Sequence, residues 1–275
     1  LLITGAANGL GKATAVEFAQ HGWNVIATDV DSAITDLAGI DGIIPKEMDV
    51  TSAESVKRVF EEVRQEYGLL DLIINNAGVD RYFPLSEAPL ESFREIFEIN
   101  LFGAYRVNQV FLPLVKSPGG RMIVIGSESY HLTLPFMPYP LTKRAVESYA
   151  RALRTELKFR GIDVVVVRPG PILTNFIKNL SGIRYYCHCD TPEASGGEAT
   201  VSDPGLSEAF KKFVASVPGE VGRVVSPEKV ASFIYRVSHI AHPRSVYRIN
   251  NSFQLRLASI LPFRIFEKMI YRRLT

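Results

Sequence analysis

The chain opens with Leu1-Leu2-Ile3-Thr4-Gly5-Ala6-Ala7-Asn8-Gly9-Leu10-Gly11, which joins a short apolar run to a glycine-rich turn and then to a helical pattern. Glycines permit a tight turn and let the backbone approach a phosphate closely. Free N–H groups at the start of the following helix can then meet the phosphate charge. The glycine spacing is G-x-x-x-G-x-G, which differs from the G-x-G-x-x-G of the longer dinucleotide fingerprint. Placed between a strand and an amphipathic helix, the turn predicts a pyrophosphate cradle formed by Gly5, Asn8, Gly9, Leu10 and Gly11.

Apolar runs and helical periods continue to alternate along the chain. Most of the runs are continuously apolar, which is typical of a parallel sheet covered on both faces. Strands are predicted at Leu1–Thr4, Asn24–Asp29, Ile43–Met48, Leu70–Asn75, Arg121–Ser127, Asp163–Arg168 and Val246–Ile249. Helices are predicted at Leu10–His21, Ala53–Tyr67, Leu90–Leu114 and Thr142–Arg160. This order, with right-handed crossovers, predicts an α/β fold: a doubly wound Rossmann fold with a parallel sheet of about seven strands and helices on both faces.

Composition places the whole chain in a single globular domain. Its 275 residues are 47% apolar, enough to bury a substantial core, and no linker or internal repeat divides residues 1–275. A formal charge of +2 gives no reason to expect a nucleic-acid partner. No apolar run reaches the ~18 residues of a membrane-spanning helix.

Cysteine use and the first residue bear on the cellular compartment. Cys187 and Cys189 are separated by one residue, so a disulfide between them would be strained, and they lack the further ligands of a zinc site. We interpret them as two loop thiols in a reducing compartment and predict no metal site. The chain begins at Leu1 inside a strand and without Met, which leaves room for a missing targeting segment. The cytoplasm is the expected location.

A carboxylate after the second strand bears on the choice of cofactor. That strand ends at Asp29, which can accept hydrogen bonds from the hydroxyls of an adenosine ribose and would repel a 2′-phosphate. No Arg or Lys lies between Gly5 and Gly11 to attract such a phosphate. The pattern favours NAD over NADP, although Asp29 could instead begin a turn. Asp49 and Val50, after the third strand, are placed to contact the adenine, and a simple turn aspartate is the alternative there.

Tyr139-Pro140-Leu141-Thr142-Lys143 places a phenol and an ammonium group four residues apart, on one face of a helix. A free tyrosine loses its proton near pH ~10, which is too high for a base at neutral pH. The Lys143 charge and an oxidised nicotinamide would favour the phenolate and lower the pKa of Tyr139. Tyr139 could then take a proton from an alcohol as hydride leaves, or return one to a ketone.

Two upstream residues support this chemistry. Ser127 ends a strand and can polarise the same substrate oxygen, although Ser129 is a nearby competitor. Asn100 lies inside a long helical pattern, where asparagine is unfavourable and needs a reason such as holding a water against Lys143. A polar helix position facing solvent is the alternative for Asn100.

The order of these motifs resembles that of the short-chain dehydrogenases/reductases. The similarity covers Leu1 to Thr174 and rests on Thr4–Gly11, Asn75-Asn76-Ala77-Gly78, Asn100, Ser127, Tyr139, Lys143 and Arg168-Pro169-Gly170. The resemblance implies a catalytic tetrad of Asn100, Ser127, Tyr139 and Lys143. It implies that Asn76, Ala77 and Gly78 contact the cofactor near the adenine-side ribose, and that Lys143 binds the nicotinamide ribose beside Tyr139. It also implies that the nicotinamide pocket is lined by Pro169, Gly170, Ile172 and Thr174. Asp29 matches the NAD-preferring branch. The family also implies a homodimer or homotetramer built on the long helices.

Two departures from the family pattern remove no chemical group. Pro140 follows the tyrosine where the family usually has a small polar residue, which places Tyr139 at or just before the helix start. Pro171 stiffens the segment after Pro169-Gly170.

Two segments outside the motifs bear on the substrate. Residues 181–222 are rich in Gly, Ser, Pro and acidic residues, with a short helix predicted near Ser207–Ser216, and form either a substrate lid or a surface loop. Residues 254–275 form a basic amphipathic tail that can lie on an anionic membrane, on the core or on another subunit. With Tyr82-Phe83 and Tyr185-Tyr186, the tail favours an apolar alcohol or ketone of steroid, retinoid or acyl type.

The alternative function is a catalytically idle NAD-binding regulatory protein on the same fold.

Overall fold

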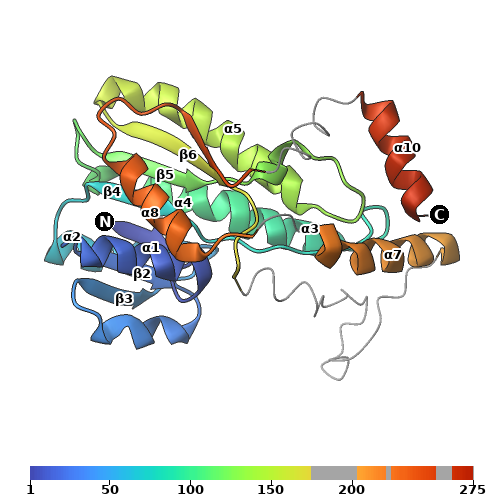
Figure 1. The fold of residues 1–275 in the computed structure, drawn as a ribbon. Coiled ribbons are helices and arrows are strands. Elements are labelled where there is room, and N and C mark those ends of the chain that lie inside the picture. The colour runs from blue at the N-terminus through green and yellow to red at the C-terminus, as the bar shows by residue number, and fades with distance from the viewer. Residues whose placement is uncertain (175–202, 221–223, 252–261, 275) are drawn as a thin grey trace.

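A seven-stranded parallel sheet forms the centre of the molecule in a computed structural model, which describes residues 1–174, 203–220, 224–251 and 262–274 (Figure 1). The strand order is β3-β2-β1-β4-β5-β6-β7. The strands are β1 (Leu2–Thr4), β2 (Val25–Asp29), β3 (Ile43–Glu47), β4 (Leu72–Asn75), β5 (Arg121–Ile125), β6 (Asp163–Pro169) and β7 (Val246–Ile249). The order reverses between β1 and β4, which is where ligands bind in doubly wound sheets, at the carboxyl ends of the strands. The predicted fold class is confirmed.

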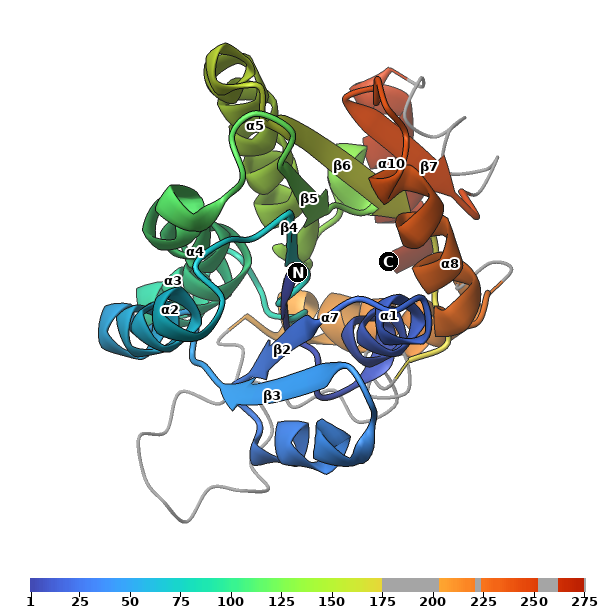
Figure 2. The same cartoon turned by 90° about the vertical axis from the view of Figure 1, so that its left-hand side faces the viewer.

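Helices cover both faces of this sheet (Figure 2). One face carries α1 (Gly9–Gln20) and α8 (Pro227–Ser238), which are in contact with each other. The other carries α2 (Ala53–Glu66), α4 (Ala104–Phe111) and α5 (Tyr139–Leu157). Neighbouring strand residues point to opposite faces, so Leu2 belongs to the core under α2 and α4 while Ile3 belongs to the core under α1 and α8. This double burial explains why the strands read as continuous apolar runs.

The helix predicted over Leu90–Leu114 is interrupted. It divides into α3 (Leu90–Phe97), the π-helical segment η2 (Glu98–Gly103), α4 and the 3₁₀ turn η3 (Leu112–Leu114). A π-helical turn holds one more residue than an α-helical turn, and such turns occur often at functional sites. Asn100 lies in this segment and is 2% exposed, so the solvent-facing alternative for Asn100 is wrong.

Other element boundaries differ from the predicted ones by a few residues. Helix α5 begins at Tyr139, as the proline at its second position suggested, and is followed by the 3₁₀ turn η5 (Lys158–Arg160). Strand β5 ends at Ile125, two residues before Ser127. Two further 3₁₀ helices, η1 (Ser32–Gly39) and η4 (Glu128–His131), lie in segments for which no helix was predicted.

Two helices lie beyond the carboxyl ends of the strands, α7 (Pro204–Glu220) and α10 (Phe263–Leu274) (Figure 1). Helix α7 is longer than the predicted Ser207–Ser216. The two helices contact each other and contribute to a buried cluster. We call it the aromatic cluster, and it consists of four aromatic residues and one leucine: Tyr82, Phe136, Phe210, Phe213 and Leu274. Among the helices of the described ranges, we find none with the length and apolar character needed to cross a bilayer. Cys187, Cys189 and Tyr185-Tyr186 lie outside the described residues, as does the rest of the predicted lid up to residue 202.

Candidate active site

The glycine-rich turn after β1 has the tight backbone that its sequence predicted. Gly5 and Gly9 have φ angles of +68° and +55°, in the left-handed region that side chains disfavour. A Cβ on Gly11 would overlap the carbonyl oxygen of Gly5, so only glycine fits there. Helix α1 begins at Gly9 directly after Asn8, so its N-terminus, including Leu10, faces the turn. The turn can therefore accept a phosphate against backbone N–H groups.

Asn76 and Ala77 hold this turn from the end of β4. The Asn76 Nδ2 atom donates to the carbonyl oxygens of Thr4 at 3.0 Å and Gly5 at 2.8 Å. The Thr4 hydroxyl accepts hydrogen bonds from the backbone N–H groups of Asn76 and Ala77. A Cβ on Gly5 would lie 2.7 Å from the Cα of Ala77, so the two segments are in close contact. Asn76 thus shapes the cradle by fixing its backbone.

Asp29 lies against the same turn. Its Oδ2 atom accepts a hydrogen bond from the Ala7 N–H at 2.9 Å and its Oδ1 atom accepts one from the Asp31 N–H at 3.0 Å. The carboxylate is half-buried and retains free lone-pair directions, because an ionised carboxylate can accept about four hydrogen bonds. Asp29 therefore caps a turn and also adjoins the cradle, and its contact with an adenosine ribose stays a prediction.

The Asp49 carboxylate has a clear local role. Its Oδ1 atom accepts hydrogen bonds from the Thr51 N–H at 2.8 Å and the Thr51 hydroxyl at 2.7 Å, in the turn before α2. The carbonyl oxygen of Val50 accepts from the Arg106 guanidinium. The turn interpretation of Asp49 therefore has direct contacts to support it, and the structure brings neither residue into contact with the glycine turn.

The segment after β6 returns to the glycine-rich turn. Gly170 follows Pro169 and lies so close to Asn250 that a Cβ would overlap the Asn250 carbonyl oxygen. Ile172 pairs with Val225 beyond it. The Thr174 methyl group lies 3.1 Å from where a Cβ on Gly9 would be. The structure thus brings Thr174, the last of the predicted nicotinamide-side residues, to the predicted phosphate cradle.

Tyr139, Lys143 and Ser127 meet at the carboxyl end of β5. Tyr139 is the first residue of α5 and Lys143 follows one turn later, with its Nζ atom 5.5 Å from the centre of the Tyr139 ring. The Ser127 side chain forms a hydrogen bond with the Tyr139 phenol. The Ser129 hydroxyl lies 2.9 Å from the Ser127 hydroxyl. Ser127 is therefore in direct contact with Tyr139, and Ser129 lies behind it.

Asn100 connects the loop after β4 to α5. Its Oδ1 atom accepts a hydrogen bond from the Val79 N–H at 2.8 Å, and its Nδ2 atom donates to the Val79 carbonyl and the Thr142 hydroxyl, both at 2.9 Å. Lys143 is buried, and its Nζ atom donates to the Ile125 carbonyl at 2.9 Å. A Cβ on Gly78 would lie 3.2 Å from Asn100 Oδ1 and 3.6 Å from Lys143 Nζ. All four residues of the predicted tetrad thus adjoin one another.

Burial changes the acidity of the tyrosine and lysine in opposite directions. Burial raises the pKa of Tyr139, the nearby Asp80 carboxylate raises it further, and the hydrogen bond from Ser127 opposes both. In the protein alone, loss of solvation therefore raises the pKa of Tyr139. The lowering expected with an oxidised nicotinamide bound stays a prediction. Burial lowers the pKa of Lys143 from 10.5 to about 8, and Asp80 acts in the opposite direction.

Asp80 is a residue of this site that sequence reasoning missed. It follows Gly78-Val79 and interacts electrostatically with both Tyr139 and Lys143. Burial raises its pKa to about 7, against the effect of hydrogen bonds from the Tyr82 hydroxyl and the Arg81 N–H. The available signal in the sequence was the position of Asp80 in the loop after β4, near the place where the strand order reverses. A lone acidic residue in a loop gives no further indication in the sequence.

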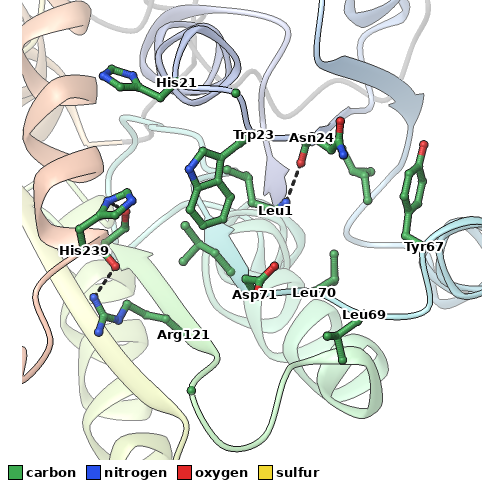
Figure 3. A pocket seen from close by; sticks show the side chains of 15 residues that line it. Leu1, His21, Trp23, Asn24, Tyr67, Leu69, Leu70, Asp71, Arg121 and His239 are labelled. Carbon is green, nitrogen blue, oxygen red and sulfur yellow. Dashed lines mark hydrogen bonds between the residues drawn. The ribbon is translucent and has the colours of Figure 1, made fainter.

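A cavity of about 700 Å³ lies at the opposite edge of the sheet (Figure 3). It is lined by residues at the amino ends of the strands, including Leu1, Trp23, Asp71, Arg121 and His239. The main-chain nitrogen of Leu1 donates to the Asn24 carbonyl oxygen at 2.7 Å. Ser127 and Tyr139 lie at the carboxyl ends, so this cavity is separate from the candidate active site.

Comparisons with known proteins agree with this geometry. Residues 1–182 match the family model described as short chain dehydrogenase. An uncharacterized oxidoreductase of Bacillus subtilis, YusZ, is 28% identical over 99% of this chain and 97% of its own length. An NADPH-dependent 3-dehydrocapnine reductase of Ornithobacterium rhinotracheale is 27% identical over 99% of this chain and 96% of its own length. A short chain dehydrogenase/reductase of Burkholderia phymatum, solved in complex with NAD, has the same fold: its TM-score is 0.74 at 22% identity, over 98% of this chain and 94% of that chain.

Proposed function

The chain belongs to the short-chain dehydrogenase/reductase family, and from that premise we propose that it interconverts apolar secondary alcohols and ketones with NAD as cofactor. The family establishes an NAD(P)-dependent oxidoreductase that acts on CH–OH groups. The observation that carries the proposal is the contact of Ser127 with the Tyr139 phenol, with Lys143 one helical turn away.

The residues at the carboxyl ends of β1, β2, β4 and β6 fit a dinucleotide. The turn from Gly5 to Gly11 would hold the pyrophosphate against the N-terminus of α1. Its tight backbone needs glycine, because a Cβ at Gly5 would collide with Ala77 and one at Gly11 with the Gly5 carbonyl oxygen. Asp29 would bind the adenosine ribose and favour NAD, and Asp49 and Val50 would lie toward the adenine. The remaining contacts would come from Asn76, Ala77, Gly78, Tyr139, Lys143, Pro169, Gly170, Ile172 and Thr174. When bound, the nicotinamide supplies the chemistry of hydride transfer.

Four side chains would perform the proton chemistry. In the oxidative direction, Tyr139 takes the hydroxyl proton of the alcohol as general base, and in the reductive direction it returns a proton to the ketone oxygen. Ser127 donates a hydrogen bond to the same oxygen and keeps the Tyr139 phenol in position. The Lys143 charge favours the phenolate and binds the nicotinamide ribose. Asn100 positions the lysine and the loop at Val79, since it contacts both this loop and α5.

The aromatic cluster supports an apolar substrate. The centroid of the Phe213 ring lies 6.3 Å from that of Tyr82 and 5.5 Å from that of Phe136. Tyr82 also donates to Asp80, which adjoins the catalytic pair. An apolar chain attached to the reacting carbon would therefore extend toward this buried cluster by way of Tyr82.

Two further properties of the protein belong to this proposal. The half-exposed Phe102 and Tyr105, in η2 and α4, offer apolar surface for a homodimer or homotetramer. The outer face of α10 presents Ile265, Met269 and Tyr271, which favours peripheral contact with a membrane.

The test is turnover by the purified chain. We expect it to reduce NAD with an apolar secondary alcohol, measured as absorbance of the reduced cofactor, and to do so faster than with NADP. Binding of NAD without turnover of any alcohol in a broad panel would favour the alternative, an idle NAD-binding regulatory protein.

A further inference from the structure

Asp80 is an acidic side chain beside the catalytic pair that the proton chemistry does not use. The Asn100 side chain binds both the N–H and the carbonyl of Val79, which fixes the backbone immediately before Asp80. The neighbouring Gly78 packs against Lys143, because a Cβ on Gly78 would lie 3.6 Å from the lysine Nζ atom. The same asparagine that adjoins the tetrad therefore also places Asp80 at the site.

The hydrogen-bonding capacity of Asp80 is only partly used within the described residues. Its Oδ2 atom accepts a hydrogen bond from the Tyr82 hydroxyl at 3.0 Å, and its Oδ1 atom accepts one from the Arg81 N–H at 2.8 Å. A carboxylate has about four acceptor positions, so each oxygen can accept another donor.

The nearest cations do not form a direct ion pair with this carboxylate. The Arg81 guanidinium donates to Glu95 at 2.8 Å and to the main-chain oxygen of Asp80 at 3.0 Å. Lys143 donates to the Ile125 carbonyl. In the part of the chain that the structure describes, no ion pair joins Asp80 to Lys143 or to Arg81. Among the described residues, the Asp80 carboxylate thus has no direct ionic partner.

Tyr82 joins Asp80 to the aromatic cluster. Its hydroxyl binds Asp80, while its ring is buried and lies 6.3 Å from the ring of Phe213 in α7. The Asp80 carboxylate therefore lies beside the catalytic pair, and the buried aromatic cluster begins at its hydrogen-bond partner Tyr82.

We propose that Asp80 determines substrate specificity by accepting a hydrogen bond from an ammonium group on the carbon next to the reacting carbon. The preferred substrates are then apolar vicinal amino alcohols and the corresponding amino ketones, with the apolar chain against the aromatic cluster. This inference rests on the proposed oxidoreductase function. A hydroxyl in place of the ammonium group forms a weaker hydrogen bond, because charge-assisted bonds are about twice as strong as neutral ones. A carboxylate at that carbon is repelled.

The ammonium group takes no part in the redox step itself. In oxidation, the carbinol hydrogen leaves as hydride to the oxidised cofactor and the hydroxyl proton passes to Tyr139. The C–N bond stays intact, so the products are the amino ketone and the reduced cofactor.

The test compares four substrates of one chain length: the vicinal amino alcohol, the vicinal diol, the unsubstituted secondary alcohol and the matching hydroxy carboxylate. A hydrogen bond to a charged group corresponds to about a 10- to 150-fold preference in kcat/KM for the amino alcohol over the unsubstituted alcohol. The Asp80→Asn variant keeps the shape of the side chain and removes its charge, so this ratio should fall to near one. Glu95→Gln is the matched control: it removes a nearby carboxylate that binds Arg81 and should leave the ratio unchanged.

Calorimetric titration of the amino alcohol onto the complex with reduced cofactor gives the same comparison without turnover, because an alcohol has no hydride acceptor there. Equal binding of the amino and unsubstituted alcohols, or a ratio that survives in Asp80→Asn, overturns the inference about Asp80. A uniform loss with all four substrates also overturns it, because Asp80 would then act through the charge of Lys143. Selective binding without any oxidation supports Asp80 and instead contradicts the proposed function.

Discussion

The side-chain amide of Asn76 donates to the carbonyl oxygen of Gly5 at 2.8 Å and so joins the segments that follow β4 and β1. Gly5 has a left-handed backbone and lies at the point where the predicted cradle begins. A second bond from the same amide nitrogen, to Thr4, fixes the last residue of β1. The conformation of the glycine turn therefore depends on a residue more than 70 positions away, as well as on its own glycines.

Replacing Asn76 with alanine removes both of these hydrogen bonds. Each contributes about 0.5–1.5 kcal/mol, so we expect a loss of about 1–3 kcal/mol in the free energy of unfolding, measured by denaturant titration. The dissociation constant for NAD should rise as well, because the turn is no longer fixed. Asn75→Ala is the matched control, because Asn75 donates instead to Asn108 in α4, at 2.8 Å. If the two variants bind NAD equally well, the link from Asn76 to the cofactor is wrong.

Replacing Asp29 with alanine should narrow the preference for NAD over NADP. The carboxylate accepts the Ala7 N–H at the cradle, where its charge would repel a 2′-phosphate. The measurement is the ratio of the two dissociation constants. Asp31→Ala serves as the control, since Asp31 is exposed and its carboxylate caps η1 through the Ala33 N–H at 3.0 Å. A wild-type protein that binds NADP more tightly than NAD would contradict the assignment of Asp29.

The sequence predicted the fold and the tetrad because their signals are local. Apolar runs marked the strands, and the four-residue spacing of Tyr139 and Lys143 required only that α5 be a helix. The π-helical turn at Asn100 left no trace in the sequence, since a hydrophobic period of 3.6 residues does not reveal a single wider turn. That turn nevertheless gives the reason for an asparagine inside a helical pattern.

Asp80 and the aromatic cluster could not be predicted because their positions depend on distant contacts. Asp80 is placed through Asn100, and the cluster joins Tyr82, Phe136, Phe213 and Leu274, which come from four separate segments. The pKa of Tyr139 was expected to fall beside Lys143 and an oxidised nicotinamide, because the sequence displays the lysine but not the extent of burial. In the protein alone, burial and Asp80 raise this pKa.

Helix α10 leads to a prediction about membranes. Ile270 and Leu274 pack on the aromatic cluster, whereas Ile265 and Met269 are 49% and 57% exposed on the outer face. With the basic residues of this helix, such a face favours anionic lipid surfaces. We expect the protein to co-sediment with anionic vesicles more than with neutral ones, and Ile265→Asp with Met269→Asp to reduce that binding. Unchanged sedimentation, together with a changed oligomeric size in the double variant, would identify the face as a subunit contact instead.

Lys143 should make cofactor binding depend on pH. A lysine is charged below its pKa and neutral above it, and burial has lowered the pKa of Lys143 from 10.5 to about 8. If the ammonium group binds the nicotinamide ribose, the affinity for NAD should be full below this pH and fall as the pH rises through about 8. Lys143→Met keeps the apolar stem, and it should bind weakly at every pH without this dependence. Parallel pH profiles for the two proteins would exclude Lys143 as the titrating group.

Tyr139→Phe tests the proposed acid–base residue. It removes only the hydroxyl, so the ring should still pack at the start of α5 and the fold should survive, as measured by circular dichroism. General acid–base catalysis contributes roughly 10²–10⁴-fold, and the loss should appear in kcat while the affinity for NAD stays nearly unchanged. Lys143→Ala should differ, because it removes both the charge that favours the phenolate and the expected ribose contact. Both kcat and NAD affinity should then fall.

The ionisation of Tyr139 provides a second readout. Burial and Asp80 raise the pKa of this phenol in the protein alone. The positive charge of an oxidised nicotinamide favours the phenolate, so saturating NAD should lower the pKa. The difference in tyrosinate absorbance between the wild type and Tyr139→Phe, recorded with and without NAD, measures this shift directly. Near-normal turnover by Tyr139→Phe, or a tyrosinate signal that NAD leaves unmoved, would show that another group transfers the proton.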